Sequence, residues 1–471
     1  MMNTQTLPPI IQGGMGIGIS GWRLARAVST AGQLGVVSGT ASDILMTRTL
    51  EDGDPGGHLR RALDHFPLRD VAARILREHF NPHGRKHNAP YHSVKLLKFP
   101  MTKEREELIM AATFAEVFLA KEGHDGVIGI NLLTKVQLPT LASIYGAMLA
   151  DVDVVVMGAG IPREIPGVLD RFANHEDASI RLDVVGTDAG EFYDLHFDPK
   201  HHVDAGHAPL HRPQFLAIIS SNSLATMLAR KATGRVDGFI VEGPTAGGHN
   251  APPRGEVVLS ERGEPVYGPR DAVDLNALAS IGLPFWIAGG AGTTEAYRAA
   301  IDAGATGIQI GTLMAFCEES GFAPEIRNDV IDAALAGTLQ VFTDPLASPT
   351  GYPFKLVGLG HAPEPAEPRT RRCDLGYLRT MYKLEDGRIS HRCPAEPVKI
   401  FTAKGGTAEE TTGRRCLCNA LLANTGHGQV RKDGTTEPTL ITAGDQAEHL
   451  GEFLHGRTSY TARDVLDYLQ N

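Results

Sequence analysis

Eight short apolar runs, most of them followed by a helical pattern, constrain the fold of this 471-residue chain most strongly. The runs occupy residues 9–14, 34–38, 126–131, 152–157, 215–220, 236–242, 284–289 and 307–311, and helical patterns between them cover 22–31, 138–149, 224–231 and 294–303. Unbroken runs rich in β-branched residues are typical of strands buried on both faces of a parallel sheet. The alternation predicts an α/β fold, a (β/α)8 TIM barrel, with a doubly wound open sheet as the alternative architecture.

Two insertions interrupt this alternation. Residues 181–185 form a ninth strand pattern, and we assign it to an insertion at about 171–212 because the other runs already count to eight. A second insertion at about 50–120 holds helical patterns at 68–80 and 103–121. The predicted barrel with its insertions therefore spans residues 1–340.

The pattern changes after about residue 340, where prolines cluster and four of the five cysteines follow. We predict that residues 341–471 form a C-terminal extension that wraps or covers the barrel. Residues 459–470 fit an amphipathic helix that Thr461 caps. The extension's cysteines are Cys373, Cys393, Cys416 and Cys418, while Cys317 is expected in the barrel core. Their spacing lacks a Cys-x2-Cys pair, so buried reduced thiols are favoured and no metal ligand is assigned, although a metal site and a disulfide stay open.

Composition excludes several classes of function. The net charge is −10, aromatic residues make up 6% of the chain, and no dense Lys/Arg run occurs, which argues against nucleic-acid binding. The apolar runs are far shorter than a membrane helix requires, and the N-terminus lacks a signal pattern. Five cysteines are typical of a reducing compartment, so we expect a soluble cytoplasmic protein without membrane contact.

The chemistry-bearing residues stand where the predicted strands end. In a barrel these ends meet on one face, which is where active sites are built. Gly289, Gly290, Gly311 and Thr312 follow the last two runs. Glycines at these two strand ends let backbone N–H groups approach a phosphate, so the four residues predict a phosphate site, with tight turns alone as the structural alternative.

His249 follows two glycines, Gly247 and Gly248, at the end of the sixth run. Such glycines let a flat ligand lie against the backbone and place an imidazole at its edge. Because the ordinary pKa of histidine is near neutrality, His249 is the candidate acid–base residue. The glycines at 13–18 lack the spacing and the ribose-binding acid of a dinucleotide fingerprint, so that reading is set aside.

Several of these motifs together resemble the nitronate monooxygenase (2-nitropropane dioxygenase) family, whose members are FMN-dependent (β/α)8 barrels related to the FMN-dependent enoyl-ACP reductases. The motifs are IIQGGMG at 10–16, GVVS at 35–38, GIN at 129–131, EGPTAGGH at 242–249, AGG at 288–290 and QIGT at 309–312. They occur in the family's order over about residues 8–320. The chain departs from the family pattern at Gly13 and Gly14 (usually Ala-Pro), at Thr245 (usually Glu) and at Glu242 (often Gln).

The resemblance implies roles for individual residues. His249 matches the catalytic base, Asn131 and Glu242 match positions that contact the flavin ring, and Gln309 matches the phosphate region. The full set of cofactor-binding residues that we expect is Gly14, Met15, Asn131, Glu242, Gly247, Gly248, Gly289, Gly290, Gln309, Gly311 and Thr312.

The predicted function is an FMN-dependent oxidoreductase, a nucleotide-binding flavoprotein similar to nitronate monooxygenases, which oxidise alkyl nitronates with dioxygen. The alternative is an FMN-dependent NAD(P)H enoyl-thioester reductase of fatty acid or polyketide synthesis. A flavin-binding protein without turnover is the second alternative. The substrate is expected to be a small molecule, a nitronate or an enoyl thioester, and the oligomeric state is open, a homodimer included.

Overall fold

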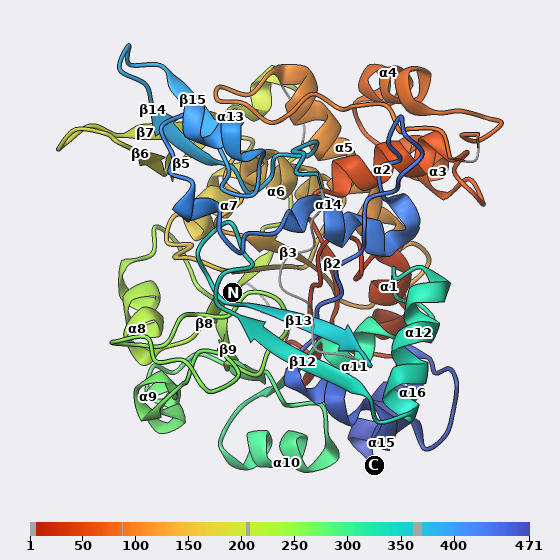
Figure 1. The fold of residues 1–471 in the computed structure, drawn as a ribbon, viewed down its shortest axis with the longest axis vertical. Helices are drawn as coiled ribbons and strands as arrows, with labels where there is room; N and C mark the ends of the chain where they lie inside the picture. Colours follow the sequence, from red (N-terminus) through yellow and green to blue (C-terminus); the bar gives the residue numbers. More distant parts are fainter. Residues whose placement is uncertain (1–5, 87, 204–207, 361–369) are drawn as a thin grey trace.

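Eight parallel strands form a nearly closed barrel in the computed structural model, which describes residues 6–86, 88–203, 208–360 and 370–471 (Figure 1). The strands are β1 (Ile10–Gln12), β2 (Gly35–Ser38), β3 (Ile128–Leu133), β4 (Val154–Gly158), β8 (Gln214–Ile219), β9 (Gly238–Glu242), β10 (Phe285–Ala288) and β11 (Gly307–Ile310). They pair in the order β2-β3-β4-β8-β9-β10-β11-β1, and a parallel bridge between Ile11 and Leu34 links the two edges. The predicted (β/α)8 barrel is confirmed.

Alternating side chains along each strand fill the barrel or face the surrounding helices. Val154 and Val156 of β4 lie in the inner cluster with Trp286, whereas Val155 and Met157 belong to the larger core outside it. The Trp286 indole N–H donates to the Pro8 carbonyl at 3.0 Å. Successive side chains of a strand point to opposite faces, and both faces of each barrel strand are buried. The barrel strands therefore have unbroken apolar sequences.

Helices cover the outside of the barrel, and the four predicted from the sequence are all present. They are α1 (Trp22–Thr30), α6 (Thr140–Leu149), α8 (Asn222–Lys231) and α10 (Thr294–Asp302), joined by α7 (Ile165–Ala173), α9 (Leu275–Ala279), α11 (Thr312–Ala315) and α12 (Pro324–Leu335). Ser221 and Thr293 cap α8 and α10, because their hydroxyl groups accept hydrogen bonds from first-turn N–H groups.

A helical layer between β2 and β3 occupies the first predicted insertion. Within the predicted bounds lie α3 (His58–Leu63), α4 (Arg69–His79) and α5 (Lys103–Lys121), while α2 (Ser42–Glu51) belongs to the same layer but precedes the predicted start at about residue 50. The long helix α5 is mostly buried, since it packs against α1, α2, α3 and α6. Across the described residues, no helix has both the length and the apolar character that a bilayer crossing requires.

The second predicted insertion contributes small strands outside the barrel. They are β5 (Ala178–Leu182), β6 (Val184–Val185) and β7 (Tyr193–Phe197), and β5 pairs antiparallel with β7. The single strand predicted at 181–185 is wrong in detail, because the segment is divided between the end of β5 and β6, which belong to two different sheets outside the barrel. Residues 204–207 of this insertion lie outside the described residues.

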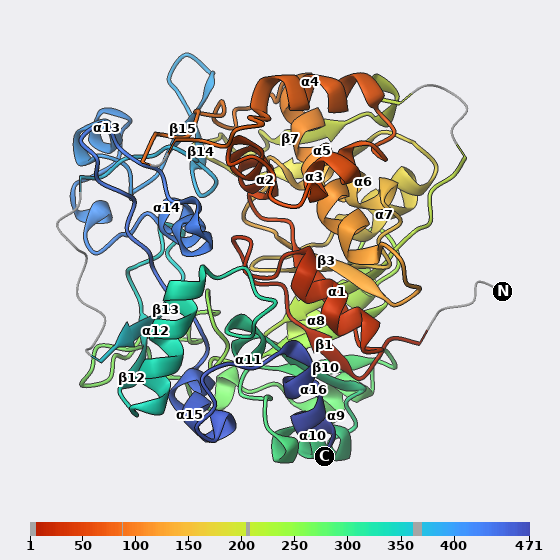
Figure 2. The ribbon, with the colours of Figure 1, turned by 90° about the vertical axis from the view of Figure 1, so that its right-hand side faces the viewer.

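The C-terminal extension wraps one side of the barrel (Figure 2). Its elements are the antiparallel pair β12 (Leu339–Asp344) and β13 (Phe354–Leu359), then β14 (Thr380–Lys383), β15 (Ile389–Arg392), α13 (Val398–Ala403), α14 (Leu417–Leu422), α15 (Leu450–Leu454) and α16 (Ala462–Gln470). Strand β14 pairs with β6 of the second insertion. Helix α16 returns to pack on α1 and α10, so the end of the chain is anchored on the barrel.

Removing the cap of α16 should weaken this anchor. The Thr461 hydroxyl accepts from the Asp464 N–H at 3.2 Å, while the Asp464 carboxylate accepts from the Thr461 N–H at 2.7 Å. Loss of such a cap costs about 1 kcal/mol, so Thr461→Ala should lower the free energy of unfolding in urea by roughly that amount. Thr461→Ser keeps the hydroxyl and is the matched control. Equal unfolding curves for all three proteins would mean that the cap contributes nothing.

Candidate functional site

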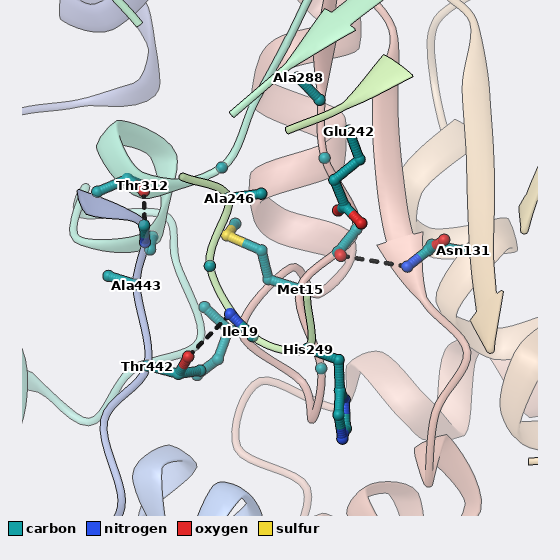
Figure 3. A pocket seen from close by; sticks show the side chains of 18 of the residues that line it. Met15, Ile19, Asn131, Glu242, Ala246, His249, Ala288, Thr312, Thr442 and Ala443 are labelled. Carbon is teal, nitrogen blue, oxygen red and sulfur yellow. Dashed lines mark hydrogen bonds between the residues drawn. The ribbon is translucent and has the colours of Figure 1, made fainter. Parts of the chain in front are cut away.

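A cavity of about 240 Å³ opens at the carboxyl ends of the barrel strands. It is lined by all twelve residues that the sequence assigned to the site: Gly14, Met15, Asn131, Glu242, Gly247, Gly248, His249, Gly289, Gly290, Gln309, Gly311 and Thr312. Figure 3 shows Met15, Asn131, Glu242, His249 and Thr312 arranged around it from different strand ends. The barrel topology thus brings together residues that are almost 300 positions apart.

A close contact between Gly14 and Asn131 shapes one wall. A Cβ on Gly14 would lie 2.2 Å from the Asn131 Cβ, so only glycine fits at position 14. The Asn131 side-chain N–H donates to the Gly14 carbonyl at 3.2 Å (Figure 3). Its buried Oδ1, like the Oε1 of Gln309, has no hydrogen-bond partner among the residues that the structure describes. Buried acceptors without partners are costly, so this wall suits a ligand that carries N–H groups.

The predicted phosphate region lies where β10 and β11 end. Gly289 and Gly290 have φ values of 86° and 70°, in the left-handed region that favours glycine. Gly311 directly precedes the short helix α11, and the Thr312 hydroxyl accepts a hydrogen bond from the Gly444 N–H at 3.0 Å (Figure 3). The extension therefore closes this corner of the cavity, which sequence reasoning did not foresee.

Glu242 ends β9 and interacts electrostatically with Lys135, a half-buried lysine that sequence reasoning missed. Burial raises the pKa of Glu242 to about 7, and the charge of Lys135 partly opposes that shift. Burial also lowers the pKa of Lys135 to about 7. The Lys135 Nζ lies 2.9 Å from the centre of the Tyr352 ring, and within the described part of the chain it has no hydrogen-bond partner. The sequence offers one indication that Lys135 belongs to the site, because it lies four residues after Asn131, just beyond the end of β3.

The shifted pKa of Glu242 predicts a pH-dependent effect on stability. Between about pH 4.5 and 7, the folded protein holds a proton on Glu242 that the unfolded chain has lost, so rising pH destabilises the wild type. Glu242→Gln removes this titration. We compare the free energy of unfolding of the variant with that of the wild type, both without flavin. The difference should favour the variant more at pH 8 than at pH 5, by at most about 3 kcal/mol and by less where water fills the cavity. Urea unfolding at both pH values measures the difference, and the same offset at both would contradict a raised pKa.

His249 is fixed in place by the β12–β13 pair of the extension. Its Nε2 lies 2.7 Å from the Ser348 Oγ, and its ring meets the Phe354 ring edge to face at 4.8 Å. Burial, together with the charge of Lys135, lowers the pKa of His249 to about 3. The imidazole is therefore neutral at physiological pH, and one of its nitrogens is available as a proton acceptor.

The extension supplies a whole wall of the cavity that the sequence did not reveal. Its contributions include the apolar residues Leu378, Leu417 and Leu421 and the segment 442–444. The Thr442 hydroxyl accepts from the Gly248 N–H at 3.0 Å, and a Cβ on Gly247 would lie 2.8 Å from the backbone of Ala443. The two glycines before His249 thus let the extension pack closely against this loop, and they also leave space for a ligand.

The arrangement as a whole suits a flat, polar ring system with a phosphate tail. Its lining combines glycine backbone at two strand ends, the amide groups of Asn131 and Gln309, and apolar residues of the extension. Such a mixture of apolar walls and a few convergent polar groups is typical of cofactor sites.

Comparison with known proteins agrees with the resemblance seen in the motifs. The sequence model of the family described as nitronate monooxygenase matches residues 168–345, which confirms the resemblance over that part of the chain. Comparison with curated proteins gives no match.

Solved structures of low sequence identity are also similar to this chain. FabK from Thermotoga maritima is 15% identical, with 98% of this chain and 91% of that chain covered and a TM-score of 0.47. A nitroalkane oxidase from Streptomyces ansochromogenes is 16% identical (98% and 94% covered, TM-score 0.43). The enoyl reductase domain of MlnA from Bacillus amyloliquefaciens is 12% identical (98% and 92% covered, TM-score 0.47). At TM-scores below 0.5, these likenesses do not bear on the activity.

Proposed function

We propose that the protein is an FMN-dependent oxidoreductase that oxidises alkyl nitronates with dioxygen, as nitronate monooxygenases do. The observation that carries the proposal is the convergence of all twelve expected residues on one cavity at the strand ends. The match of residues 168–345 to the nitronate monooxygenase family supports the choice of reaction.

The residues present fit FMN. Gly289, Gly290 and Gly311 would hold the phosphate through backbone N–H groups, and Thr312 would add a hydroxyl. The Asn131 amide would bind the edge of the ring, since its unpartnered oxygen can accept a hydrogen bond and its N–H groups can donate. The Gln309 amide would do the same rather than bind the phosphate as the resemblance implies, because its side chain lies beside Gly13 at the end of β1. When bound, FMN supplies the electron-transfer chemistry that no side chain in the cavity provides.

The chain's own contribution is to bind the substrate and move a proton. Neutral His249 would take the proton from the carbon of a neutral nitroalkane, or orient the nitro oxygens of a nitronate already formed. The ammonium group of Lys135, close enough to influence the pKa of both His249 and Glu242, would favour an anionic substrate over a neutral one. The apolar residues supplied by the extension would exclude water from the reacting carbon.

A second candidate function is the reduction of an enoyl thioester with NAD(P)H. The observation that favours it is the wall formed by Leu378, Leu417 and Leu421, which suits an acyl chain. In this reaction hydride reaches the β-carbon of the enoyl group, and His249 lies near the path of the proton.

Anaerobic half-reactions decide between the candidates. An alkyl nitronate should bleach the flavin absorbance of the purified protein, and dioxygen should restore it with release of nitrite. Bleaching by NADPH, followed by recovery with an enoyl thioester, would replace the nitronate proposal with the reductase. If neither bleaches the flavin, the protein is a flavin binder without either activity. Heat denaturation should release FMN, and release of FAD would contradict the cofactor proposal.

A further inference from the structure

Four of the chain's five cysteines line one small cavity in the C-terminal extension. Cys373, Cys393, Cys416 and Cys418 come from three separate segments, and the cavity that they share measures about 10 Å³. That volume is about the size of one water molecule. The fifth cysteine, Cys317, is buried in the barrel core and does not line it.

The thiols lie close enough to influence one another. Burial raises the pKa of Cys393 to about 12, and the charges of Cys373 and Cys416 add to the shift. Burial likewise raises the pKa of Cys373 to about 11, with a further contribution from Cys416.

Charged side chains of both signs, Arg379 and Glu396, line the cavity beside the thiols. The backbone N–H groups of Leu378 and Ala395 partly oppose the rise that burial causes in the pKa of Cys418 and of Cys393, respectively. The positive charge of Arg379 acts on Cys373. Backbone donors and cations around the sulfurs are the usual outer environment of thiolate–metal sites.

We propose that Cys373, Cys393, Cys416 and Cys418 bind one zinc ion through four sulfurs. Four sulfur ligands in a tetrahedral arrangement select zinc or an iron–sulfur cluster, and a cavity of this size has room for a single ion but not for a cluster. Binding exchanges four S–H protons for four Zn–S bonds, without oxidation or reduction. No three His, Cys, Asp or Glu side chains in the described ranges are already arranged as metal ligands, so the thiols must turn toward the cavity as the ion enters.

The proposed zinc site would stabilise one wall of the candidate active-site cavity. Leu378, Leu417 and Cys418 line both cavities, so an ion held by Cys418 fixes the start of α14 and the segment before β14 against each other. These are the segments that contribute the apolar wall of the candidate active site. The zinc site is therefore a structural clamp, separate from the redox chemistry.

Metal analysis of the full-length protein tests the proposal. Wild-type protein purified without chelators should contain one zinc per chain, and Cys393→Ser should lose it. Cys317→Ser, which alters an equally buried cysteine outside the cavity, should keep it. Because a variant that loses zinc can also unfold, wild-type protein stripped of metal provides a second measurement: added Co²⁺ should produce the intense near-ultraviolet absorption of cobalt–thiolate bonds.

Three results would overturn the proposal. The first is wild-type protein that carries no zinc and takes up neither Zn²⁺ nor Co²⁺. The second is iron together with acid-labile sulfide, which would mean a cluster. The third is a mass lower by two hydrogens for each cysteine pair, which would show that the thiols form disulfides.

Discussion

His249→Ala should abolish most of the activity toward a neutral nitroalkane while leaving the flavin bound. The expected loss is on the order of 10²–10⁴-fold, the usual scale for removing an acid–base group. Flavin should stay bound, because the phosphate contacts come from the ends of β10 and β11, and the ring contacts expected from Asn131 and Glu242 do not depend on the imidazole. Activity with a preformed nitronate should fall much less, because that substrate has already lost its proton. Steady-state rates with both substrates, at matched flavin content, measure the difference.

A pH profile separates His249 from Glu242 as the base. The pKa of His249 is lowered to about 3, so ionisation of His249 should leave the rate flat from pH 5 to 8, and loss of the Lys135 proton near pH 7 should only lower it. The pKa of Glu242 is raised to about 7, so a rate that depends on its carboxylate should rise through neutrality. Ser348→Ala, which removes the hydroxyl beside His249 Nε2, is the milder control. An equal, small loss with both substrates in His249→Ala would make His249 a binding residue only.

The barrel could be predicted from sequence because its signal is local. A strand buried on both faces must be apolar throughout, as in β4. The small or polar residues that come after such a run mark where the strand ends. The strand at 181–185 was excluded from the barrel by counting, and its actual partners are β7 and β14. The pairing of β6 with β14 joins segments some 200 residues apart, which no local pattern reports.

The candidate site was accessible to sequence reasoning only on its barrel side. Strand ends of a barrel meet on one face, so residues such as Asn131 and Gln309 could be assigned to one cavity without knowing the packing. The opposite wall, including Leu417 and Thr442, depends on how the extension folds back. The four extension cysteines are a similar case, because their spacing resembles no metal motif while their positions in space converge.

Gly311→Asp should remove most of the bound FMN without unfolding the protein. Position 311 has a φ of −118°, which any residue adopts, and a Cβ there would meet only Met15 at 3.6 Å. The new carboxylate would face a dianionic phosphate held by backbone N–H groups and the Thr312 hydroxyl, with no cationic side chain assigned to it. Two unit charges at about 4 Å repel by roughly 4 kcal/mol in such a partly buried site, so the dissociation constant of FMN should rise at least ~100-fold. Flavin fluorescence titration of the flavin-free protein measures it.

Gly311→Asn separates charge from size in this experiment. Asparagine has the shape of aspartate without its charge, so its effect on FMN affinity reports steric crowding alone. A large loss in Gly311→Asp with a small loss in Gly311→Asn would support a phosphate at the ends of β10 and β11. Equal losses in both would attribute the effect to crowding beside Met15, and undiminished affinity in Gly311→Asp would place the phosphate elsewhere in the cavity. In that last case the backbone N–H groups of Gly289 and Gly290 would need another ligand.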